Sequence, residues 1–242
     1  MSSIEILIVV AGYSFRLKEP ARRLERAAEH AEAAGHQVAV TMVPASPVFA
    51  TTLSRLGEVL PSRWRLSPAG SDDLSASLDA AIQASRAEFL TIMDPADGVC
   101  EDWLTRCVEE AAGPATAFMP EALVTYGPNY ATHGETAFIR LPTELDAGSL
   151  SEDIVALPAR FVAPRPALAV HSFPRPDAAR GWGAPGWNEA MHWWWVCRLL
   201  SGGVSFRQVP GSVQYRALPS GADPRCLLRL QKDVRTGPWV SR

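Results

Sequence analysis

The first part of the chain alternates short apolar runs with amphipathic stretches. Residues 4–10 are almost all β-branched or leucine, which is typical of a central strand covered on both faces. Apolar positions then recur at helical spacing over residues 20–34, and the stretch stops at Gly35. Residues 36–43 return to the pattern of a strand. The order strand, helix, strand predicts an α/β domain with parallel strands.

A second apolar run, residues 89–93, stops at two acids, Asp94 and Asp97. Its length and composition predict a buried strand, so both acids would lie at its carboxyl end. Amphipathic helices are predicted on either side, over residues 72–82 before the run and from Glu101 after it. Ligands of open α/β sheets bind at the carboxyl edge of the strands. The pattern therefore predicts a ligand site at this acidic loop.

The rest of the chain is predicted to be shorter strands and loops around one more helix. Strands are predicted at residues 116–119, 123–126, 136–140, 167–173, 204–210 and 213–216. Residues 149–166 form a proline-rich connection around a short helix, and residues 175–186 are rich in Pro, Gly and Arg. The second of these segments is typical of a loop near a site or a mobile lid.

Composition narrows the class of function. The chain has 242 residues, of which 47% are hydrophobic, enough for the core of one large α/β domain. Its formal net charge of -3 argues against a protein built to bind nucleic acid. It has no basic signal-peptide start and no apolar run of the roughly 18–20 residues that cross a membrane. We expect a cytoplasmic protein without a transmembrane segment that acts on small molecules.

The cysteines do not indicate a metal or disulfide framework. None of the four, Cys100, Cys107, Cys197 and Cys226, has C-x-x-C spacing to another. Two fall on the predicted inner faces of helices, so we expect reduced thiols rather than a zinc site.

The acidic loop resembles that of the inverting family 2 glycosyltransferases, which have the GT-A fold. Asp94, Asp97 and Leu104 match the first acid, the last acid and the helix leucine of the family pattern Asp-x-Asp-Asp followed by a helix. Ala96 takes the place of the middle acid.

A second stretch, residues 186–216, resembles the back half of the same family. It has the family's order of a Gly-aromatic-x-Glu motif, a helix ending Arg-Leu-x-x-x-Gly, a strand reaching Pro and a closing Tyr-Arg. The resemblance implies a GT-A fold over residues 1–216, with a mainly parallel sheet and helices on both faces. Residues 217–242 would then form a basic amphipathic tail.

The resemblance also implies a site for a nucleotide-sugar donor. Asp94 and Asp97 would hold Mn²⁺ or Mg²⁺ through their oxygens, and Asp94 would lie at the nucleotide as well. Gly12 and Tyr13, in the loop after the first strand, and the closing Arg216 complete the implied nucleotide-binding set.

The family's catalytic base is replaced in this chain. Counting back from Arg198 puts His192 where the family has the aspartate that serves as general base. An imidazole titrates near neutrality and could take that role, with Glu189 as the alternative base, although a histidine beside tryptophans is also typical of a packed residue. Trp187 and Trp193 could stack on the acceptor. Since consecutive tryptophans on a helix cannot all face one way, at least one should belong to the core.

Two functions from different classes remain open. The first is inverting transfer of a sugar from a nucleotide-sugar donor to an unknown acceptor. The second is a GT-A-fold protein that has lost or changed transfer chemistry and acts as a binding or scaffold subunit. Four departures from the family motifs point towards the second: Val43, Leu78, Ala96 and His192. We nevertheless favour the first. The sequence does not specify the donor sugar, the acceptor or the oligomeric state.

Overall fold

The computed structural model describes residues 1–10, 18–44, 63–67, 74–94, 97–111, 113–126, 137–141, 143–145, 160–173 and 195–217. A helix at residues 195–201 precedes the last strand. The other elements are, in chain order, β1 (Ser3–Val10), α1 (Lys18–Ala33), β2 (Gln37–Pro44), β3 (Trp64–Leu66), α3 (Leu74–Ala84), β4 (Phe89–Met93), β5 (Asp97–Val99), α4 (Trp103–Glu109), β6 (Thr116–Tyr126), β7 (Ala137–Arg140), β8 (Glu144–Leu145), β9 (Val162–Pro164), α6 (Arg165–Ala169) and β10 (Ser205–Ala217).

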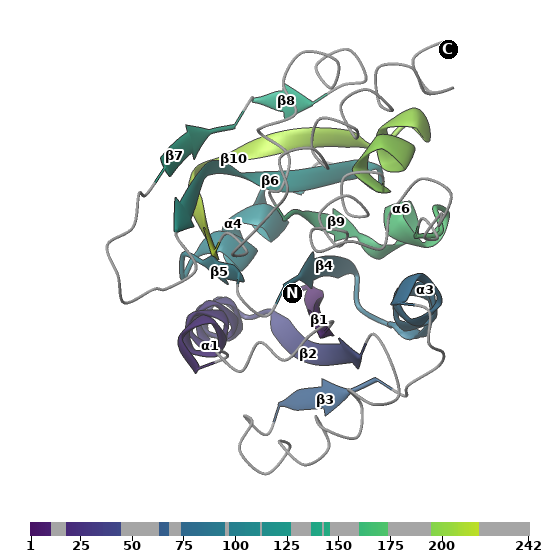
Figure 1. Cartoon of the computed structure of the whole chain (residues 1–242), viewed down its shortest axis with the longest axis horizontal. Helices are drawn as coiled ribbons and strands as arrows, with labels where there is room; N and C mark the ends of the chain where they lie inside the picture. Colours follow the sequence, from purple (N-terminus) through teal and green to yellow (C-terminus); the bar gives the residue numbers. More distant parts are fainter. Residues whose placement is uncertain are drawn as a thin grey trace.

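One mixed sheet runs through the protein in the order β3-β2-β1-β4-β9-β6-β10-β5, with β7 beside β6 and β8 beside β10 (Figure 1). Its longest ladders are parallel and join β1 to β2, β1 to β4 and β6 to β10. Shorter antiparallel pairings attach β5, β7, β8 and β9. The predicted α/β class with a mostly parallel sheet is confirmed.

Alternate side chains of β1 contribute to two cores, one on each face of the sheet. Leu7 and Val9 pack in the cluster that also contains residues of α3 and α6. Ile4, Ile6 and Ile8 pack in the cluster that contains residues of α1 and α4. Because successive side chains of a strand point to opposite faces, a strand between two helical layers needs apolar residues at nearly every position. Figure 1 shows the two helix pairs on opposite sides of β1.

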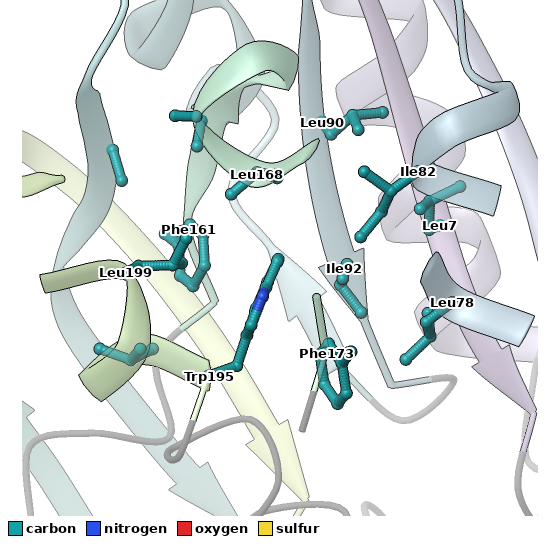
Figure 2. Packing of buried hydrophobic residues seen from close by; sticks show 14 of the residues in the cluster. Leu7, Leu78, Ile82, Leu90, Ile92, Phe161, Leu168, Phe173, Trp195 and Leu199 are labelled. Atoms are coloured by element: carbon teal, nitrogen blue, oxygen red, sulfur yellow. The ribbon is translucent and has the colours of Figure 1, made fainter. Parts of the chain in front are cut away.

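Trp195 lies at the centre of the first core (Figure 2). Its side chain is fully buried, with ring centroids 5.0 Å from Phe173 and 5.5 Å from Phe161. Its indole Nε1 donates a hydrogen bond to the carbonyl oxygen of His171 at 3.0 Å, which satisfies its one polar group. The prediction that at least one tryptophan of this stretch belongs to the core is confirmed.

The predicted strand over residues 167–173 is wrong. Arg165–Ala169 is the helix α6, and the strand, β9, lies just before it at Val162–Pro164. Pro166 stands in the first turn of α6, where a helix tolerates the missing N–H and the fixed φ of proline. This local preference decides between helix and strand over residues 166–170, which are all apolar.

β6 and β10 are each one long strand where the sequence predicts two. The two strands pair in parallel, and their register shifts between Val209 and Val213. Gly211 has a φ of 74°, a left-handed conformation that glycine adopts without steric cost. A bulge therefore takes up the irregular residues without ending the strand.

β10 ends at Ala217, one residue past the predicted domain boundary at residue 216. The predicted tail is residues 217–242, and its residues from 218 on lie outside the described residues. Among the described helices, none is both long enough and apolar enough to cross a membrane.

Candidate functional site

Three parallel strands end at one edge of the sheet. Val10 faces Pro44 in the register of β1 with β2, and these are the last residues of the two strands. Met93, the last residue of β4, faces Ile8 of β1. Because the chain leaves all three strands in the same direction, the loops that follow them begin at a common edge, where α/β proteins bind ligands. Asp94 is the first residue after β4, and its side chain is half-buried.

A tight turn leads from β4 to β5. The backbone N–H of Asp97 donates to the carbonyl oxygen of Asp94 at 2.9 Å, and the N–H of Asp94 donates to Oδ2 of Asp97 at 2.9 Å. Asp97 then begins β5, which pairs antiparallel with β10 and places Asp97 opposite Arg216. The predicted loop residue Asp97 is thus the first residue of a short strand, held through both its backbone and its carboxylate.

Arg160 neutralises Asp97 inside the protein. Its Nε donates to Oδ2 of Asp97 at 2.6 Å, and the two side chains are 5% and 1% exposed. The backbone N–H of Arg160 donates to Oε1 of Gln214 at 2.7 Å, and Gln214 is also buried. A charge can be buried at tolerable cost only when it is paired and hydrogen-bonded, and this pair meets both conditions.

Arg160 was not among the predicted site residues, and it lies in the stretch predicted as a proline-rich connection. The available signal was its position directly before the apolar run Phe161-Val162-Ala163. An arginine at the edge of a buried strand needs an anionic partner, and the acidic turn supplies one.

A second guanidinium, that of Arg23, lies beside β5 and β10. Arg23 of α1 lies over the ring of Tyr215, with Cζ 4.5 Å from the ring centroid. A Cβ at Gly98 would lie 2.8 Å from Cδ of Arg23, so the absence of a side chain at Gly98 makes room for this arginine. Gly98 and Tyr215 are opposite each other in β5 and β10. The tyrosine of the closing Tyr-Arg motif therefore connects α1 to the strand that begins at Asp97.

The two acids differ in their availability to a metal ion. Asp94 is half-buried at the strand end, whereas Asp97 is 1% exposed and its Oδ2 accepts hydrogen bonds from two N–H groups. Mg²⁺ at a nucleotide site is usually bound by one or two carboxylates together with substrate phosphates, and Asp94 fits that requirement. Within the described ranges, no group of three or more His, Cys, Asp or Glu side chains could hold a metal ion. The pair of metal ligands stays a prediction.

The structure brings three of the predicted site residues together: Asp94, Asp97 and the backbone of Arg216. The other predicted nucleotide, acceptor and base residues lie outside the described residues, namely Gly12, Tyr13, Trp187, Glu189, His192 and Trp193. Their roles stay predictions. The described helix that follows these residues begins at Trp195, whose side chain is in the core.

Comparison of the sequence with family models and with curated proteins gives no match. Comparison of the structure with solved structures gives matches. GalNAc-T7, crystallised with UDP, GalNAc and Mn²⁺, superposes with a TM-score of 0.54 at 12% identity, over 98% of this chain and 52% of that one. S. aureus TarS 1–349 in complex with UDP-GlcNAc gives a TM-score of 0.51 at 11% identity, over 97% of this chain and 65% of that one.

The chain thus spans about half to two thirds of the length of these two structures. At such low identity the likeness establishes the fold and not the reaction. Together with the mostly parallel sheet and its two helical layers, it shows that this protein has a GT-A-like glycosyltransferase fold.

Proposed function

We propose that this protein transfers a sugar from a nucleotide-sugar donor to a hydroxyl acceptor with inversion. The observation that carries the proposal is the position of Asp94, which follows β4 at the edge where the parallel strands end. Support comes from the fold, since GalNAc-T7 was crystallised with UDP and TarS with UDP-GlcNAc. An acid at this edge of this fold is suited to a donor whose leaving group is a diphosphate.

Departure of a nucleoside diphosphate requires stabilisation of the negative charge that develops on it. We assign the nucleotide to Gly12, Tyr13, Asp94 and Arg216, and a divalent cation, Mn²⁺ or Mg²⁺, to Asp94. When bound, the cation would supply charge neutralisation as a Lewis acid. Asp97, the second predicted ligand, contributes by holding the backbone of Asp94. GalNAc-T7 was crystallised with Mn²⁺, which supports the choice of metal.

Inversion also requires a base that takes the proton of the acceptor hydroxyl as the new bond forms. We assign this role to His192, with Glu189 as the alternative, and the acceptor to Trp187 and Trp193. If an imidazole is the base, activity should rise with pH around the imidazole pKa. That pKa is ordinarily about 6.5 and is shifted when the imidazole is buried.

Substitution of the base tests the proposal. His192→Ala should lower turnover by about 10²- to 10⁴-fold and leave nucleotide binding nearly unchanged, the usual range for lost acid–base catalysis. Glu189→Gln, which keeps the side-chain shape, is the matched variant for the alternative base. The measurement is release of UDP from UDP-GlcNAc in the presence of candidate acceptors. Unchanged turnover in both variants would rule out both assignments.

A second candidate function is a binding or scaffold subunit without transfer chemistry. The observation that favours it is the loss of the middle acid at Ala96, combined with the pairing of Asp97 to an arginine. This hypothesis predicts that the protein binds a nucleotide but consumes no sugar nucleotide. The same assay, run beside a binding titration, separates the two functions.

A further inference from the structure

We infer that Arg160 is a positioning residue of the proposed nucleotide site and that Asp97 serves as its anchor rather than as a metal ligand. The inference rests on the proposed function, because it concerns how the same site is built. It follows from four hydrogen bonds and from the strand order.

The strand order explains why Arg160 reaches the acidic turn. β9 is antiparallel to β4, with Thr91 opposite Val162, so the chain just before β9 lies beside the carboxyl end of β4. Arg160 is there, although 63 positions separate it from Asp97 in the sequence. Its backbone N–H is held by Gln214, which belongs to β10. Arg160 thus joins the start of β5 to β10, beside the carboxyl end of β4.

A series of contacts leads from Arg160 to Asp94. Arg160 holds Oδ2 of Asp97, and the same oxygen accepts the backbone N–H of Asp94. The backbone of Asp97 donates in return to the carbonyl oxygen of Asp94. Since Asp94 is the proposed contact to the cation and the diphosphate, the pair fixes the residue that would bind the ligand. Such outer partners orient a ligand residue and are needed for its affinity.

The charges argue against Asp97 as a second metal ligand. Its carboxylate is 1% exposed and is already neutralised by a guanidinium that is itself buried. A divalent cation on that carboxylate would lie close to a positive group in a low-dielectric interior, where like charges repel strongly. The absence of the middle acid at Ala96 leaves Asp94 as the carboxylate of this turn for the cation.

The two roles of Asp97 predict opposite results for Arg160→Gln. If Asp97 is an anchor, removal of the guanidinium frees the turn, and affinity for UDP in the presence of Mn²⁺ falls by about 10- to 100-fold. If Asp97 is a ligand, removal of the neighbouring positive charge strengthens Mn²⁺ binding, so the Mn²⁺ midpoint falls. Arg160→Lys, which keeps a charge, should recover part of the affinity in the first case.

A double variant completes the test. Asp97→Asn leaves the Arg160 charge buried and unpaired, and both stability and UDP affinity should fall. Asp97→Asn combined with Arg160→Gln restores a neutral hydrogen-bonded pair, and we expect UDP affinity to return to within about threefold of wild type with an unchanged Mn²⁺ midpoint. Glu101→Gln is the matched control, since Glu101 is a nearby acid whose side chain is 61% exposed in its pairing with Arg26.

The experiment is calorimetric titration with UDP at a series of Mn²⁺ concentrations, far below the melting temperature of each variant. A double variant that regains its melting temperature but stays as weak as Asp97→Asn would overturn the anchor role, as would full affinity or a lower Mn²⁺ midpoint in Arg160→Gln. A wild type that binds no UDP would refute the proposed UDP site and this inference together. If only the role of Arg160 and Asp97 is wrong, the wild type still binds UDP, so this failure is distinguishable from failure of the proposed function.

Discussion

At the scale of single residues, burial determines the chemistry of three cysteines. It raises the pKa of Cys100 to about 11 and that of Cys197 to about 12. It also raises the pKa of Cys107, which is fully buried, well above the ordinary value. Because the thiolate is the reactive form, these three thiols should stay protonated and inert in the folded protein. Cys107 and Cys197 are buried and lie on helices, which agrees with the prediction that two of the cysteines fall on inner helix faces.

We predict slow modification of these thiols. In a Cys226→Ser background, which removes the cysteine outside the described residues, DTNB at pH 8 should react about 100-fold more slowly with the native protein than with the urea-unfolded protein, because the thiolate fraction at Cys100 falls by about that factor. The absorbance of released thionitrobenzoate measures both rates. Rapid release of even one equivalent from the native protein would contradict the prediction.

The pairing of Arg160 with Asp97 could not be predicted from the sequence. Asp94 and Asp97 are recognisable because they directly follow an apolar run, which is a local pattern. The partner of Asp97 is fixed by the placement of β9 between β4 and β6, a non-local arrangement. Residue patterns therefore indicated the acids but not the charge that neutralises one of them.

At the scale of elements, the helix at residues 195–201 docks on the segment after α6. Trp195 inserts between Phe161 and Phe173, and its indole binds the carbonyl oxygen of His171. A Cβ at Gly202 would lie 2.0 Å from Cε1 of His171, so the imidazole packs directly against the glycine backbone. Aromatic packing and one close backbone approach hold this helix in place.

Trp195→Ala should therefore be strongly destabilising. We expect a loss of about 3–5 kcal/mol in the free energy of unfolding, the range for removing a large buried aromatic side chain and leaving a cavity. Urea denaturation followed by circular dichroism measures it, and Trp195→Phe should lose clearly less. A change below about 1 kcal/mol for Trp195→Ala, as at an exposed site, would show that the helix is not docked as described.

Docking at His171 should make stability depend on pH. Burial, and then the positive charge of Arg198, lower the pKa of this imidazole below its ordinary value. As pH falls, the unfolded chain takes up the proton first, so the free energy of unfolding should decline from about pH 6.5 downward. Urea denaturation between pH 5 and pH 8 should show a smaller decline for His171→Asn than for wild type. Equal declines in the two proteins would contradict this cause.

Element prediction succeeded where the pattern was local and strong. β1, β2, β4 and α1 were recognisable because continuous apolar runs and helical spacing leave one interpretation. α6 was mistaken for a strand because a short apolar segment fits both, and Pro166 at its first turn was the overlooked signal. β6 and β10 were each predicted as two strands. Proline is uncommon inside a sheet, yet Pro120 and Pro210 lie within these strands, and β10 continues through a bulge.

At the scale of the whole molecule, the two halves of the sheet were not equally predictable. The first half follows β-α-β rules, in which neighbours in sequence become parallel neighbours in space. In the second half, β9 separates β4 from β6, and β10 lies between β6 and β5. These placements depend on contacts between distant segments, so the GT-A class was predictable from motif order but the strand order was not.

The candidate site also has a part that was predictable from the sequence and a part that was not. The acidic turn and the Tyr-Arg motif could be found from sequence, and the structure places their backbones opposite each other in β5 and β10. The donor sugar and the acceptor have no local code in the sequence, and the base is assigned only by counting back from Arg198, so these assignments rest on the proposed function.

A calorimetric titration with UDP-GlcNAc tests whether a nucleotide-sugar donor binds at the edge of the sheet where Asp94 lies. Wild type, Asp94→Asn and the control Glu101→Gln are compared in Mn²⁺ and in EDTA. We predict binding by wild type and the control in Mn²⁺, and affinity lower by about 10- to 100-fold in EDTA or in Asp94→Asn. Absence of binding by the wild type, or equal affinity of wild type and Asp94→Asn, would contradict the account.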